Sequence, residues 1–153
     1  MDRPADFPTV TERSVERLNA LLRGEISAVE TFTLVIARFG AEAPHELDDC
    51  LRSHQLRVEK LTVRVSDLGC TPAVGSGLWG SLAKLVEGGA TLFGLKSALL
   101  TLEEGEDHGV ARYRERLDDL DVDEQSRRLI QVELMPEQLK TDYVVRDLCR
   151  SRS

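Results

Sequence analysis

The fold is decided by the stretch LDDCLRSHQLRVEKLTVRVSDL, which spans residues 47–68. Alternating steps of four and three residues place its seam on one face of an α-helix. Pro44 stands where a first helical turn begins, and Gly69 follows the last seam residue, as is usual at the two ends of a helix. The seam consists of Leu47, Leu51, His54, Val58, Leu61, Val65 and Leu68.

Three more stretches show the same helical period. The first runs from a cap at Thr9 or Thr11 to about Phe39, where Gly40 ends it. The third runs from about residue 90 or 95 to 120, and the fourth from the acidic turn 121–123 to about 149, with a kink expected at Pro136. Their seams are Leu18, Leu21, Glu25, Ala28, Phe32, Val35 and Phe39; Leu95, Leu99, Leu102, Glu106, Val110, Tyr113 and Leu117; and Ile130, Leu134, Glu137, Thr141, Val144 and Leu148.

The longest interruption, residues 71–94, separates the second helix from the third. It contains Trp79, and one short amphipathic helix is expected around Leu82 and Leu85. A connection of this length can carry the chain along the whole bundle, as in ferritin-like topology. We therefore predict an all-α fold, a ferritin-like four-helix bundle with a long crossover carrying a short helix between helices 2 and 3. Residues 1–10 are expected to form a flexible leader and residues 11–150 a single domain.

Composition excludes several classes of protein. The chain has 153 residues, 31% of them charged, and a net charge of −7, which disfavours nucleic-acid binding because phosphate contacts need a basic face. Three cysteines without CxxC spacing do not predict a disulfide framework or a zinc site. No apolar stretch is long enough to span a membrane, so the predicted location is cytoplasmic. Long helical seams also favour a homodimer, and the sequence indicates no particular protein partner.

Each predicted helix carries one ionisable seam residue near its midpoint: Glu25, His54, Glu106 and Glu137. Antiparallel helices of similar length should bring these four together, and buried carboxylates need a partner, a proton or a cation. This pattern predicts a metal site at the bundle centre. Three alternatives stay open: the glutamates reach water at the seam edge, His54 is a hydrogen-bonded core histidine, and Glu137 pairs with Lys140 or Lys60.

Di-iron bundles take a Glu from each of two helices and Glu-x-x-His from each of the other two. Glu25 and Glu106 meet the first requirement, but the second helix has Leu51 three residues before His54, and the fourth has Lys140 three residues after Glu137. Four of the six ligand positions are therefore present. Three carboxylates and an imidazole suit iron, manganese or zinc, so we expect weak binding of a divalent metal as the cofactor, or none.

The segments LNALLRGEISAVETF (18–32), LEEGEDHGVARYRERL (102–117) and DYVVRDL (142–148) resemble a known family. Together with the tryptophan-containing crossover and Leu68-Gly69 before Pro72, they look like the bacterial ferritin-like family catalogued as domain of unknown function 2383. The resemblance covers roughly residues 15–148 and implies a ferritin-like bundle. The resemblance implies that ferritins and rubrerythrins are similar in fold. Their di-iron ligands would correspond to Glu25, His54, Glu106 and Glu137 of this chain.

Three functional hypotheses follow. The first is a ferritin-like protein that binds a divalent metal weakly, in metal handling or stress response. The second is a metal-free structural or partner-binding bundle, and the third is a di-iron oxidase with an atypical ligand set. The absence of GxSxG, HExxH and phosphate-loop motifs favours a role other than catalysis, and no catalytic residue is predicted.

Overall fold

The computed structural model describes residues 7–76 and 94–152. Over these ranges the chain is all-α, without a strand, which confirms the predicted class. The elements are α1 (Val10–Phe39), η1 (Gly40–Glu42), α2 (Glu46–Asp67), α4 (Gly94–Leu117), α5 (Glu124–Leu129), η2 (Ile130–Leu134) and α6 (Met135–Ser151).

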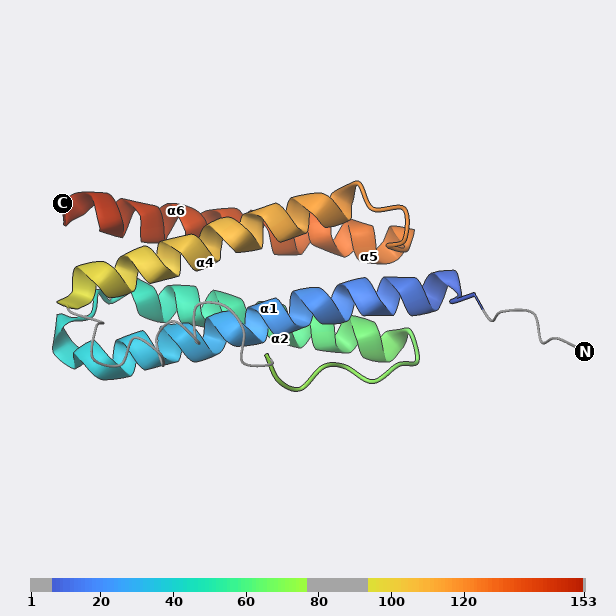
Figure 1. The fold of residues 1–153 in the computed structure, drawn as a ribbon, viewed down its shortest axis with the longest axis horizontal. Coiled ribbons are helices and arrows are strands. Elements are labelled where there is room, and N and C mark those ends of the chain that lie inside the picture. Colours follow the sequence, from blue (N-terminus) through green and yellow to red (C-terminus); the bar gives the residue numbers. More distant parts are fainter. Residues whose placement is uncertain (1–6, 77–93, 153) are drawn as a thin grey trace, which may run out of the picture.

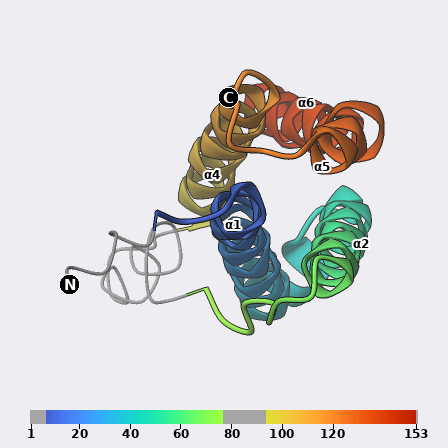
Figure 2. The same ribbon diagram turned by 90° about the vertical axis from the view of Figure 1, so that its right-hand side faces the viewer.

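The helices form a bundle of two antiparallel pairs. Helix α1 packs against α2, and α4 packs against α6, with the two pairs stacked on each other (Figures 1 and 2). Helices α2 and α4 run in the same direction, so the end of α2 and the start of α4 lie at opposite ends of the bundle (Figure 1). The short helix expected around Leu82 and Leu85 lies outside the described residues.

Several helix ends follow their sequence signals. Thr9 caps α1 in a capping box with Glu12, and Gly40 ends it with φ of 51°. Gly69 follows α2 with φ of 78°, a conformation that costs glycine little. Asp123 caps α5 by accepting a hydrogen bond from the Ser126 backbone N–H at 2.9 Å. These signals therefore predicted the helix ends well.

The apolar core is divided in two along the bundle. One cluster contains Leu18, Leu61 and Ile130, and the other contains Phe32, Leu47 and Leu99. In α1, α2, α4 and α6 the buried residues that lie between the two clusters are polar. The fold therefore places a polar layer at the middle of the bundle, between two apolar halves.

A kink was expected in the fourth helix at Pro136, and the helix is irregular just before that residue. A π-helical turn, η2, precedes it, and the Met135 N–H donates to the Ile130 carbonyl five residues back. Pro136 then stands at the start of α6, where a missing N–H is tolerated. The buried face also differs from the predicted seam, because Gln138 and Val145 are buried in place of Glu137 and Val144.

Candidate functional site

Six buried polar side chains form the layer between the two apolar halves, and the hydroxyl of Tyr113, whose ring belongs to one of these halves, reaches into it. None of them is more than 4% exposed. Helix α1 contributes one, and α2, α4 and α6 contribute two each. We call this group the central cluster: Glu25, His54, Arg57, Glu106, Tyr113, Gln138 and Thr141.

The imidazole of His54 bridges the two buried carboxylates. Its Nδ1 lies 2.6 Å from Glu25 Oε2 and its Nε2 lies 2.7 Å from Glu106 Oε1. Burial by itself lowers the pKa of His54, but the carboxylates of Glu106 and Glu25 outweigh it, and the pKa is raised above 6.5. Because each ring nitrogen faces a carboxylate oxygen, we assign His54 as an imidazolium that donates one hydrogen bond to each glutamate. Arg57 Nη2, which lies 3.0 Å from Nδ1, is then a close neighbour without a hydrogen bond to the ring.

Arg57 brings a second positive charge into the same layer. Its Nη1 lies 3.1 Å from Glu25 Oε1, and the guanidinium also donates to Gln138 Oε1 and to Thr141 Oγ1. Burial raises the pKa of Glu25, but Arg57 and then His54 more than offset this effect and the pKa is lowered. Glu25 is therefore ionised at neutral pH.

The remaining oxygen atoms of the two glutamates are also hydrogen-bonded. The Tyr113 hydroxyl donates to Glu25 Oε1 at 2.5 Å. Glu106 Oε2 accepts from Thr141 Oγ1 at 2.5 Å and from Gln138 Nε2 at 3.0 Å. With two carboxylates, one guanidinium and one imidazolium, the central cluster has no net charge. Buried groups of this kind are tolerated only when they are paired and hydrogen-bonded in this way.

Glycine at position 109 makes part of this arrangement possible. A Cβ atom at Gly109 would lie 2.6 Å from Nε2 of Gln138 and 2.8 Å from its Cδ. Gly109 therefore leaves the space in which the Gln138 amide reaches both Arg57 and Glu106.

The structure brings together three of the four predicted site residues. Glu137 lies apart from Glu25, His54 and Glu106, at the partly exposed edge of α6. It accepts hydrogen bonds from Ser53 Oγ and Lys140 Nζ, each at 2.9 Å. Both bonds lower the pKa of Glu137, and the bond from Lys140 has the larger effect. The pairing with Lys140 was one of the alternatives that the sequence left open.

Sequence reasoning missed Arg57 and Gln138. Arg57 precedes Val58 and Gln138 follows Glu137, and the sequence pattern assigned Val58 and Glu137 to the buried seams. The pattern could not choose between such neighbours, because a step of three and a step of four residues both satisfy the helical period. An arginine beside an apolar seam is usually exposed to solvent, so the sequence gave no reason to place Arg57 in the core of the bundle. The closest signal was Gly109, a glycine in mid-helix opposite a long polar side chain.

The donor set does not fit a metal ion. A metal needs its ligands around one point, at about 2.0–2.2 Å for nitrogen and oxygen, whereas the ring of His54 lies between the carboxylates of Glu25 and Glu106. Their oxygen atoms already accept hydrogen bonds, and Arg57 adds a permanent positive charge. Within residues 7–76 and 94–152, no group of three or more His, Cys, Asp or Glu side chains could hold an ion.

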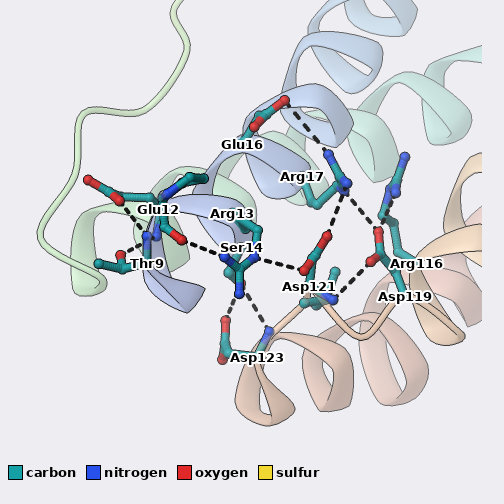
Figure 3. A network of polar contacts seen from close by, with 12 residues as sticks. Thr9, Glu12, Arg13, Ser14, Glu16, Arg17, Arg116, Asp119, Asp121 and Asp123 are labelled. Carbon is teal, nitrogen blue, oxygen red and sulfur yellow. Dashed lines mark hydrogen bonds and ion pairs between the residues drawn. The ribbon is translucent and has the colours of Figure 1, made fainter. Parts of the chain in front are cut away.

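A second polar cluster lies at the end of the bundle where α1 begins (Figure 3). There the start of α1 meets the acidic turn that joins α4 to α5, and α2 contributes Arg64. Asp123 is central to it: burial alone raises the pKa of this carboxyl, but hydrogen bonds from Ser126 and Ser14 lower it to about 2. We call this group the end cluster: Arg13, Ser14, Arg17, Arg64, Arg116, Asp119, Asp121, Asp123 and Ser126.

In comparisons with known proteins, no family model, curated protein or solved structure matches this chain. No helix among the described residues is both long and apolar enough to cross a membrane.

Proposed function

We propose that this protein is a metal-free helical bundle that acts through protein contacts at its surface, and that its central cluster fixes how the four helices align. The observation that carries the proposal is the buried guanidinium of Arg57, which contacts Glu25, Gln138 and Thr141. The sequence-based metal hypothesis used a cation to balance the buried glutamates, with a partner or a proton as the other possibilities. Arg57 and protonated His54 supply that positive charge from within the chain.

A buried ionic cluster is a poor source of stability. Removing two ions from water costs several kcal/mol each, and apolar replacements of similar volume are often equally stable. The cluster can instead provide specificity, because its hydrogen bonds are satisfied in only one alignment of the helices. A slipped helix would leave charged groups unpaired between two apolar halves. We infer that the central cluster selects one bundle register and so gives the surface a single shape.

The first test is elemental analysis of protein purified from medium supplemented with iron and manganese. We expect far less than one metal ion per chain, and the same free energy of unfolding with and without a chelator. The matched control is the double variant Glu25→Ala, Glu106→Ala. Near-stoichiometric metal in the wild type that is lost in this variant would overturn the proposal in favour of weak metal binding, and two irons per chain would favour the oxidase.

The second test concerns register. A variant in which the whole central cluster is apolar (Glu25→Met, His54→Leu, Arg57→Met, Glu106→Met, Tyr113→Phe, Gln138→Leu and Thr141→Val) removes every charge without leaving a single unpaired partner. We expect it to stay helical and about as stable as the wild type, but to show broad, poorly dispersed amide signals in NMR. A single sharp set of signals would contradict a role in specifying register.

We also propose that the bundle is ferritin-like in its connections, as the resemblance to the family described above implies. The parallel course of α2 and α4 supports this proposal (Figure 1), since a ferritin-like crossover joins two parallel helices. A cytoplasmic location remains part of the proposal. The test of the topology is an experimental structure that traces residues 77–93.

A further inference from the structure

A groove of about 630 Å³ lies between α1 and α4. Its volume is in the range of about 300–1,000 Å³ that is usual for small-molecule sites. Residues with a small side chain or none line it on both helices: Gly24, Ser27 and Ala28 of α1 and Gly105 of α4. The space between these helices is therefore large enough for a small organic ligand. We call it the α1–α4 groove.

The two ends of the α1–α4 groove differ in chemistry. Helices α1 and α4 run in opposite directions (Figure 1), and Arg112 of α4 lies beside Gly24 of α1. This end is lined by Arg112 and Arg23. The other end is lined by Phe32 of α1 and Leu102 of α4, which belong to one apolar core cluster. The groove therefore joins a basic end to an apolar end.

The charge of the α1–α4 groove comes from Arg23 and Arg112. Both are exposed, and in the part of the chain that the structure describes neither guanidinium has an ion pair or a hydrogen bond. His108, on the rim of the groove, already contacts the backbone oxygen of Glu104. The acidic side chains that line the groove also have other partners: Glu104, Glu106 and Glu115. In a chain with a net charge of −7, two such arginines at one end of a groove favour an anionic ligand.

The fold places the hydrogen-bond donors at the basic end. A Cβ atom at Gly24 would lie 2.8 Å from Nη1 of Arg112, so the glycine leaves the space in which this guanidinium lies against α1. Arg116 lines the same groove, and its Nε–H is buried without an acceptor among the described residues, although its Nη1 donates to Asp119 at 2.6 Å. Buried N–H groups nearly always have an acceptor, and a bound oxyanion is the kind of group that provides one.

We propose that the α1–α4 groove binds a small organic anion, with a carboxylate or phosphate head group at Arg23 and Arg112 and an apolar body in the apolar end. Guanidinium groups bind both kinds of head group through paired, charge-assisted hydrogen bonds. This inference goes beyond the proposed function and can fail separately from it, because the metal and register tests do not change Arg23 or Arg112.

The first test is isothermal titration calorimetry of the full-length protein with octanoate and with octyl phosphate. Octanol supplies the chain without the charge, and inorganic phosphate supplies the charge without the chain. We expect an octyl anion to bind with one molecule per protein chain, about tenfold more tightly than either control. The head group that binds more tightly distinguishes a carboxylate ligand from a phosphate ligand.

Two variants locate the site. Arg112→Gln should weaken binding about tenfold, because it removes a charged donor. Gly24→Ala should weaken binding as well, because the new methyl group displaces the Arg112 guanidinium, whereas the helix should be at least as stable as in the wild type. Circular dichroism and thermal unfolding check that both variants are folded. Arg114→Gln is the matched control, since Arg114 is also exposed on α4 but lies outside the groove lining, and it should bind like the wild type.

Three outcomes would overturn the proposal. In the first, neither octyl anion binds. In the second, octanol binds as tightly as both anions, which would mean that the arginines play no part. In the third, binding is unchanged in both Arg112→Gln and Gly24→Ala, because the anion then binds elsewhere on the protein.

Discussion

The central cluster and the end cluster use the same kinds of side chain in opposite surroundings. In the centre, Glu25, Arg57 and Glu106 are at most 4% exposed. In the end cluster, the Arg13 and Asp121 side chains are 35% and 36% exposed, and the ion pairs lie around the start of α1 and the acidic turn (Figure 3). The chain therefore contains a dry ionic network and a partly hydrated one within a single bundle.

This difference in burial determines how much stability the protein loses when one partner of an ion pair is removed. At the hydrated end, water replaces a lost partner, and exposed pairs contribute only about 0–1 kcal/mol. In the centre the side chains are buried, so losing one partner costs about 3–5 kcal/mol. Similar distances, such as 2.8 Å for Arg13–Asp121 and 3.1 Å for Arg57–Glu25, thus do not imply similar energies. Four predictions test this contrast.

The largest effect is expected for Arg57→Met. This change keeps the approximate volume but leaves the Glu25 carboxylate with one fewer cation and Gln138 without its donor. We expect the free energy of unfolding, measured by urea titration, to fall by about 3–5 kcal/mol. Adding Glu25→Gln should recover part of the loss because it removes the unpaired charge. A loss below about 1 kcal/mol for Arg57→Met would mean that water reaches the centre.

The sequence predicted the fold more fully than the site, for a physical reason. Helix ends at Thr9 and Gly40 depend on local chemistry, which a sequence states directly. Which of two adjacent residues turns inward depends on packing between helices. Gln138 is buried and Glu137 is not, since Gly109 leaves space for the glutamine and Lys140 holds the glutamate at the edge. The approach of Gln138 to Gly109 joins two helices and cannot be predicted from either segment alone, whereas the Glu137–Lys140 pair lies within one helix and was among the alternatives that the sequence left open.

The next effect compares two glycines within helices, Gly109 in α4 and Gly24 in α1. Replacing a helical glycine by alanine normally stabilises a helix by about 1 kcal/mol. Gly109→Ala would press into the buried amide of Gln138, so we expect a net loss of about 1–2 kcal/mol from overpacking. Gly24→Ala meets only the end of Arg112, an exposed side chain, and should stabilise by about 0.5–1 kcal/mol. Thermal unfolding measures both; equal effects would contradict a rigid centre.

The third prediction concerns the dependence of stability on pH. The pKa of His54 is raised in the folded protein, so the native state retains a proton that the unfolded chain loses near pH 6.5. The stabilising effect is complete below that pH and is lost as pH rises through the native pKa, with a slope of at most about 1.4 kcal/mol per pH unit.

Urea titrations from pH 6 upward measure this slope in the wild type and in His54→Gln. The variant has no group that titrates at this position, so its slope should be flatter. A wild-type slope that matches the variant would show that His54 is not an imidazolium in the folded protein.

The smallest effect is expected for the ion pair between Arg13 and Asp121 in the end cluster. A double-mutant cycle with Arg13→Met and Asp121→Asn isolates the pair, and we expect a coupling of about 0.2–1 kcal/mol. Because both side chains are about one-third exposed, molar salt should remove most of this coupling. The loss in Arg57→Met should hardly change with salt, since counterions do not reach a buried charge. If salt reduced both effects equally, the contrast between a dry and a hydrated network would be wrong.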